Sequence, residues 1–177
     1  MKNPLIIGKL EAAKRQLETA IDLYFNYKDP VSIHTLCAAA YNIVHDVNTQ
    51  RGGDPMVKDL WRLLDTRQAK EFKQHINRVD NFLKHADKDP DGLCTLNQEW
   101  TEALLLEATQ RYMLLTGEQS PRMVLFLVWF MVRHPKVFEA KPPLDLVLKR
   151  LDMTVFSDDR QQFLAEFWSL AVQSAGT

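Results

Sequence analysis

Three polar residues with the spacing of one helix face are the strongest candidates for chemistry in this 177-residue sequence. Arg78 and His85 are seven residues apart, about 20° short of two full helical turns, so both side chains are expected to leave a helix on the same side. Asn81 lies one turn before His85 and is placed to orient its ring. An imidazole transfers protons near neutral pH, and a guanidinium binds phosphate oxygens. Arg78, Asn81 and His85 therefore predict a catalytic site for phosphate chemistry.

The elements that must position these residues are predicted to be helices. Apolar residues recur with helical spacing from Ile6 to Tyr24, and two cap-plus-proline pairs, Asp29-Pro30 and Ser120-Pro121, mark helix starts. No stretch alternates as a half-buried strand does. Further helices are expected over about 57–64, 67–86, 98–115, 144–151 and 159–172. The sequence predicts one all-α domain, residues 1–177: an antiparallel up-and-down helical bundle over about 5–118 with a C-terminal helical extension over about 120–173.

Four of the five histidines fall on two of the predicted helices. His34 and His45 share a face of the second helix but lie about 16 Å apart along it, too far to hold one metal ion. His75 and His85 share a face of the 67–86 helix. A metal site with one histidine from each helix is an alternative, although such sites usually add carboxylates or thiolates. Packing is the commoner role for a helix histidine, and we predict no metal and no cofactor.

An acidic turn follows the candidate residues and matches part of a calcium-binding loop. Asp87, Asp89, Asp91 and Gly92 have the D-x-D-x-D-G spacing with which such loops begin. The twelfth position should supply a bidentate glutamate, and here it is Gln98. The loss of that ligand favours a polar connection between helices.

Charge and composition limit the function classes. The net charge is −1, whereas proteins that hold long nucleic acids usually carry a strong basic excess. Between Lys58 and Lys88, eight basic residues stand against five acidic ones, which would suit a short RNA or, more commonly, a solvated helix surface. Cys37 and Cys94 form no paired motif, which favours the cytoplasm. The longest apolar run, Met123 to Val132, is too short for a membrane span of about 20 residues.

The segment RVDNFLKH, from Arg78 to His85, resembles the R-x(4–6)-H motif of the HEPN superfamily. Members are small helical bundles, and many are metal-independent endoribonucleases of toxin and defence systems. The resemblance covers about residues 5–118, with Val79 where the family commonly has a polar residue. It implies that His85 takes the proton of a ribose 2′-hydroxyl while Arg78 stabilises the charged phosphorane, which leaves a cyclic phosphate and a 5′-hydroxyl end.

The resemblance also implies a homodimer in which the motif helices face each other. Met123 to Val132, together with Phe163, Phe167 and Trp168, are candidates for such an interface, and ordinary core is the favoured interpretation of both groups.

Two function hypotheses follow. The first is a HEPN-like endoribonuclease that uses Arg78 and His85, and the second is a helical interaction or regulatory module that binds a protein, a nucleotide or a small ligand without catalysis. The near-neutral charge favours the second hypothesis, and the Arg78, Asn81 and His85 face favours the first. We expect RNA or a protein as the partner, and no membrane. No phosphate-binding loop, dinucleotide fingerprint, nucleophile elbow or HExxH motif is present in the sequence.

Overall fold

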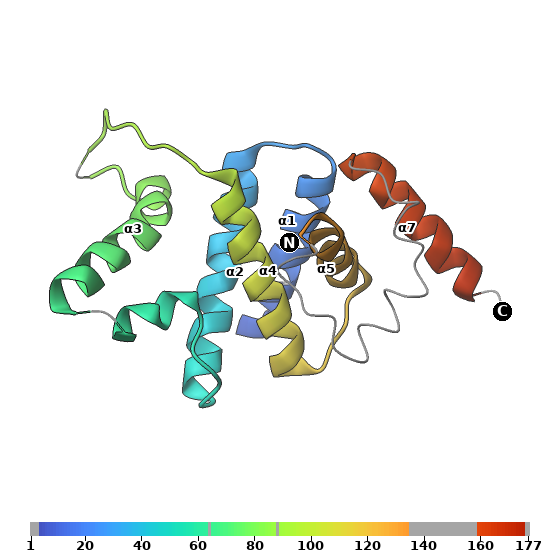
Figure 1. Ribbon diagram of the computed structural model, residues 1–177, viewed down its shortest axis with the longest axis horizontal. Coiled ribbons are helices and arrows are strands. Elements are labelled where there is room, and N and C mark those ends of the chain that lie inside the picture. The colour runs from blue at the N-terminus through green and yellow to red at the C-terminus, as the bar shows by residue number, and fades with distance from the viewer. Residues whose placement is uncertain (1–3, 64, 88, 135–158, 176–177) are drawn as a thin grey trace.

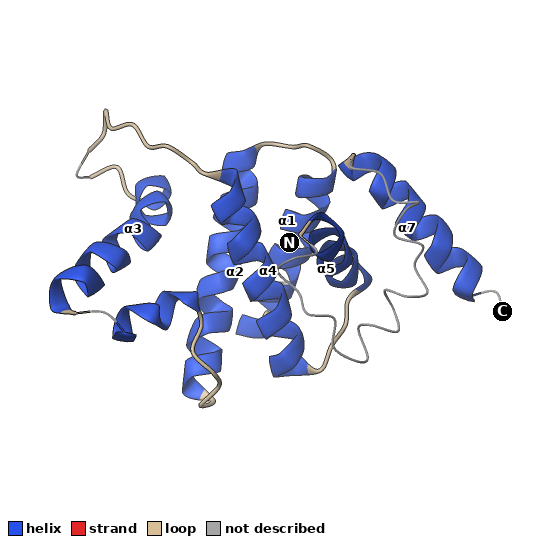
Figure 2. Cartoon of the chain, in the orientation of Figure 1, coloured by secondary structure: helices blue, strands red, loops and turns tan. Residues whose placement is uncertain are grey.

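A computed structural model describes residues 4–63, 65–87, 89–134 and 159–175, and within them the chain is helical with no strand (Figures 1 and 2). The predicted all-α class is confirmed. The short helix predicted for 144–151 lies outside the described residues. The helices are α1 (Lys9–Phe25), α2 (Pro30–Gln50), the 3₁₀-helix η1 (Val57–Leu63), α3 (Thr66–Lys84), α4 (Gln98–Thr116), α5 (Pro121–Arg133) and α7 (Arg160–Ala175).

Several helices begin and end where local chemistry requires it. The Asp29 carboxylate accepts a hydrogen bond from the Ser32 backbone N–H at 2.8 Å, with Pro30 in the first helical position. Ser120 caps α5 in the same way, its hydroxyl accepting from the Met123 N–H. α4 ends at Gly117, whose φ of 72° is a left-handed conformation that glycine adopts without strain.

One apolar core joins α1, α2, α4 and α5. Its largest fully buried side chains include Phe25, Tyr41, Leu105 and Phe126. α5, which follows residue 118, packs into this core as well, and among the described helices α7 comes after it. α7 is attached through Phe163, whose ring stacks on Phe25 with centroids 6.2 Å apart.

The two candidate dimer surfaces have different outcomes. Six residues of the Met123 to Val132 run are buried, so that run is core, as the favoured interpretation had it. In α7, Phe163 is fully buried and Phe167 is partly buried against the core, whereas Trp168 is 38% exposed. Most of the apolar residues that the sequence analysis named as candidates for a dimer interface are therefore buried within a single chain.

The strict up-and-down order is interrupted between α2 and α4. α1 runs antiparallel to α2 across a short connection, but α2 and α4 run in the same direction, because η1 and α3 carry the chain back to the starting end of α2 before α4 begins (Figure 1). Successive contacts therefore move in the same direction along both helices: His34 contacts Thr101, Tyr41 contacts Glu107, and Arg51 contacts Leu115.

η1 and α3 form an arm, residues 57–84, at the side of the bundle. α3 packs on η1 and on α2, and Figure 1 shows it standing apart from α1, α4 and α5. The arm carries Arg78 and Asn81, and His85 follows directly after its last residue. Among the described helices, none combines the length and the apolar character that crossing a bilayer requires.

Candidate functional site

α3 is the platform for the candidate site because its two faces differ sharply. Its start is set by Asp65, whose carboxylate accepts hydrogen bonds from the backbone N–H groups of Arg67 and Gln68. Ile76 and Asp80 face inward and are buried, whereas Arg78 and Asn81 are exposed. The helix therefore presents a guanidinium and a carboxamide to solvent, as its sequence pattern predicts.

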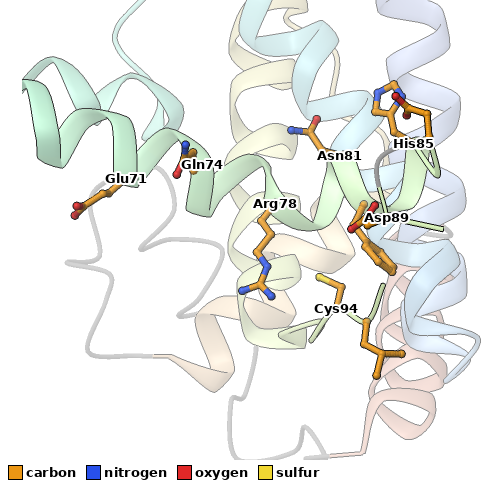
Figure 3. Close-up of a pocket in the computed structure, with 10 residues that line it drawn as sticks. Glu71, Gln74, Arg78, Asn81, His85, Asp89 and Cys94 are labelled. Atoms are coloured by element: carbon orange, nitrogen blue, oxygen red, sulfur yellow. The ribbon is translucent and has the colours of Figure 1, made fainter. Parts of the chain in front are cut away.

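An open pocket of about 940 Å³ lies along the outer face of α3 and the turn that follows it (Figure 3). All three residues predicted from the sequence line it, so the structure brings Arg78, Asn81 and His85 to one concave surface. The described residues that line it are Glu71, Gln74, Arg78, Asn81, Phe82, His85, Asp87, Asp89, Leu93 and Cys94.

His85 does not project as the helical spacing predicts. α3 ends at Lys84, and His85 is the capping residue, with an extended backbone at φ −133° and ψ 118°. The prediction that Arg78 and His85 leave one helix face assumed a helix to residue 86, and for His85 it is wrong. In Figure 3 the Arg78 side chain extends toward Cys94, whereas Asn81 and His85 lie on the other side of the α3 ribbon. The residues share a pocket without converging on one point.

The three side chains are available to a ligand. Within the part of the chain that the structure describes, Arg78, Asn81 and His85 make no side-chain hydrogen bond or ion pair, and all three are exposed. A bound group would therefore displace water from them without breaking contacts inside the protein.

Acidic and apolar groups share the same pocket. Among the described lining residues, Glu71, Asp87 and Asp89 supply three carboxylates and Arg78 supplies one guanidinium. The Glu71 carboxylate is already paired with Arg67 at 3.0 Å, so Asp87 and Asp89 leave this described lining negative when His85 is neutral. Leu93 is 94% exposed, which is unusual for a leucine beside a concave surface. This lining is suited to a ligand that carries positive charge and some apolar surface, and it repels a polyanion.

The acidic turn after α3 closes on itself. The Gly92 backbone N–H donates to the Asp89 carbonyl at 2.9 Å, and a Cβ at Gly92 would lie 2.8 Å from an Asp89 carboxylate oxygen. Close approach therefore accounts for this glycine. Among the described residues, no three His, Cys, Asp or Glu side chains gather as metal ligands would.

Two of the helix histidines have partners inside the protein. His34 is 2% exposed, and its Nδ1 lies 2.9 Å from the Thr101 hydroxyl. The His45 ring stacks on Tyr41, and its Nε2 lies 3.2 Å from an Asp59 carboxylate oxygen. These contacts are typical of packing and hydrogen-bonding residues. The side chain of His75 lies outside the described part of the chain.

Sequence reasoning missed a buried polar network that holds the arm to α2. The Lys84 ammonium lies 2.7 Å from the Asp80 carboxylate, the Asn42 amide donates to the same carboxylate at 3.2 Å, and Lys58 donates to the Asn42 carbonyl. The four-residue spacing of Asp80 and Lys84 was the only local indication of it. The contacts of Asn42 and Lys58 depend on how the arm folds back.

The charges in this network are shifted by their surroundings. Burial lowers the pKa of Lys58, because the ammonium loses its hydration. Burial works in the opposite direction on Asp80, but hydrogen bonds and positive charge from Lys84 outweigh it and hold the pKa of Asp80 below its usual value. Asp80 is therefore the ionised centre of the network.

His34 predicts a pH dependence of stability. Burial lowers the pKa of His34 below 6.5, so the unfolded chain takes up a proton near pH 6.5 while the folded chain takes it up only at lower pH. The contribution of His34 to stability is complete above about pH 6.5 and is lost as the pH falls below that value. Urea unfolding from pH 7.5 to 5 should show a declining free energy of unfolding, with a smaller decline in His34→Gln. His134→Gln, which changes an exposed histidine, should decline as the parent does. An equal decline in His34→Gln would contradict this account.

The chain was compared with protein-family models, with curated proteins and with solved structures, and none of the three comparisons gave a match.

Proposed function

We propose that this protein is a non-catalytic interaction module whose α3 pocket binds a basic, partly apolar segment of another polypeptide. The observation that carries the proposal is the described lining of the pocket: three carboxylates and an exposed leucine line it together, and the single guanidinium is unpaired within the described residues. Protein interfaces combine an apolar centre with a polar rim in this way.

Each part of the lining has a role in this proposal. Lysine or arginine side chains of the partner pair with Glu71, Asp87 and Asp89, which gives selectivity and a faster encounter more than affinity. Leu93 supplies apolar area, and burying a leucine side chain completely is worth about 1.5–3 kcal/mol. Arg78 lies between these groups and selects for a carboxylate or a backbone carbonyl at one position of the partner.

A second function is metal-independent RNA cleavage, as the HEPN resemblance implies. It is supported by the presence of Arg78, Asn81 and His85 on one exposed pocket. For this function the Arg78 and His85 side chains must turn toward a single phosphate, so that His85 takes the 2′-hydroxyl proton and Arg78 neutralises the charge on the phosphorane. The three carboxylates of the pocket oppose RNA binding, which is why we rank this function second.

A binding panel tests the first proposal. A fluorescent peptide of alternating lysine and leucine, its glutamate counterpart and a single-stranded RNA of equal length are titrated with the protein by anisotropy. We expect the lysine peptide to bind most tightly. The double variant Glu71→Gln/Asp89→Asn should weaken the binding free energy of this peptide by on the order of 0.5–2 kcal/mol, since exposed ion pairs contribute about 0.2–1 kcal/mol each.

The matched control is Glu11→Gln/Glu99→Gln, which removes two exposed carboxylates elsewhere. The interaction proposal fails if this control lowers the affinity for the lysine peptide as much as the double variant does, or if RNA binds more tightly than the peptide. Cleavage of a structured RNA in EDTA to cyclic-phosphate ends, abolished by both His85→Ala and Arg78→Ala, would establish the second function in its place.

The homodimer and the cytoplasmic location stay predictions within this proposal. Cys37 and Cys94 are both free thiols, which supports a reducing compartment. A dimer that used the α3 face would place Arg78 of one copy opposite the carboxylates of the other, so the mixed charge of the pocket supports self-association as well as a separate partner.

A further inference from the structure

A second cavity lies where the start of α7 meets the end of α1 and the starts of α2 and α4. Its volume is about 200 Å³. Ile33 and Leu105 are buried and supply an apolar floor, while Lys28, Glu102 and Arg160 supply charge. The described residues that line it are Tyr24, Tyr27, Lys28, Pro30, Ile33, Gln98, Thr101, Glu102, Leu105 and Arg160.

We propose that this cavity binds a small carboxylic acid with an aromatic or branched apolar body. The inference goes beyond the proposed function, because none of its residues belongs to the α3 pocket. Size limits the ligand first. An apolar cavity of about 150 Å³ holds benzene in another protein, so about 200 Å³ accommodates a benzene ring with one small polar group.

Charge determines the class of that polar group. Glu102 is already engaged, because its carboxylate accepts from the Tyr24 hydroxyl at 2.8 Å and from the Arg160 guanidinium at 3.2 Å. Lys28 makes no side-chain hydrogen bond or ion pair with any described residue. The described lining residues thus carry two cations and one carboxylate, with the Asp159 carboxylate bonded to Tyr27 next to them. Because Lys28 has no partner among the described residues, a carboxylate is the ligand group that its ammonium pairs with.

Arg160 also has donors to spare. Two of its N–H groups bind Tyr24 and Glu102, and a guanidinium has five in all. Its carbon lies 3.7 Å from the centre of the Tyr24 ring, so the group is held flat against one wall. The side-chain amide of Gln98 is a further donor at the rim, with no described partner.

Tyr27 joins the end of α1 to the start of α7 at this cavity. Its φ of 48° is left-handed, as is common just after a helix ends, and the Lys28 backbone N–H closes the turn on the Leu23 carbonyl at 3.0 Å. The Tyr27 hydroxyl accepts from the Arg160 backbone N–H and donates to Asp159, both at 3.0 Å. These bonds hold the start of α7 at the cavity.

The test uses benzoate with two analogues of the same shape, neutral benzamide and cationic benzylamine. Calorimetry and ¹H–¹⁵N NMR titrations are run on the full chain. We expect benzoate to bind one to one, with shifts at residues 24–33, 98–105 and 160, and to bind at least about tenfold more tightly than either analogue. Lys28→Gln should lower the affinity for benzoate about threefold and leave the affinity for benzamide unchanged, since an exposed cation contributes modestly to binding.

Lys9→Gln, at an exposed lysine outside the cavity, is the control and should bind benzoate as the parent does. Three results would each overturn the proposal: benzylamine binding as tightly as benzoate, equal losses of benzoate affinity in Lys28→Gln and Lys9→Gln, or no saturation of benzoate binding below about 10 mM. Because Lys28 is exposed, its substitution leaves the fold intact and keeps the test decisive.

Discussion

Phe126→Ala is expected to lower the free energy of unfolding by about 3–5 kcal/mol, the usual cost of removing a large buried aromatic side chain. The Phe126 ring is completely buried and meets the Tyr24 ring edge-on, with centroids 5.4 Å apart. Natural domains are stable by only about 5–15 kcal/mol, so the variant should lose a large share of its stability. Guanidinium unfolding with an unchanged m-value measures the effect.

The matched control is Leu114→Ala on α4, where the side chain is 76% exposed and the change should stay within about 0.5 kcal/mol. The pair tests the placement of α5. Were α5 a peripheral extension or a dimer surface, Phe126→Ala would alter the mass of the particle in solution and leave the unfolding of the monomer nearly unchanged.

Asp80→Ala is expected to lower the free energy of unfolding by about 1–3 kcal/mol, because it leaves partly buried polar groups without their acceptor. Asn42 loses the carboxylate that its amide binds, and the half-buried Lys58 loses its nearby negative charge. The Lys84 side chain is 39% exposed and remains solvated, so we place the cost below that of breaking a fully buried ion pair. The effect should be local, since the network joins only the arm to α2.

Hydrogen exchange measures that locality. Amides of α3 should lose protection in Asp80→Ala, while those of α1 and α4 keep theirs. Asp91→Ala, at an exposed carboxylate in the turn, should change neither. Uniform loss of protection across all helices would contradict the assignment of the network to the arm.

The same variant has a predicted pH signature. The pKa of Asp80 in the folded protein is lowered below its ordinary value of 3.8, so its contribution is complete above about pH 3.8 and is lost as the pH falls through the lower folded value. The difference in stability between the parent and Asp80→Ala should therefore be constant near neutral pH and disappear in strong acid. A difference that persists there would show that packing, and not charge, is responsible.

These expectations bear on function through the arm. The α3 pocket is formed by the outer face of the helix whose inner face carries Asp80. If the interaction proposal is correct, Asp80→Ala should lower the affinity for the lysine peptide as well as the free energy of unfolding, because it loosens the arm that carries the pocket. Benzoate binding in the second cavity, which Lys28 and Arg160 line, should be unaffected, because none of the described residues that line this cavity lies on the arm.

The candidate site was predicted in part. Arg78 and Asn81 lie on the exposed face of an amphipathic helix, and the polar and apolar residues around them are enough to show that orientation. His85 was misplaced because the helix ends before it. The residues that follow, Ala86 and Asp87, include neither the glycine nor the proline that commonly marks a helix end. Glu71 lies on α3 itself, seven residues before Arg78, whereas Asp89 enters the pocket only because the turn folds back toward α3.

Sequence alone determined the helical class and most helix boundaries, because capping bonds join residues within about four positions of each other and neighbouring side chains suffice to form them. Asp29 with Ser32 and Ser120 with Met123 are of this kind. Only the tertiary structure decided that α2 and α4 run in parallel, that Asn42 meets Asp80 across 38 positions, and that Arg160 reaches Tyr24 across 136. Such contacts depend on which helix faces bury their apolar surface together, and that choice is made by the whole chain.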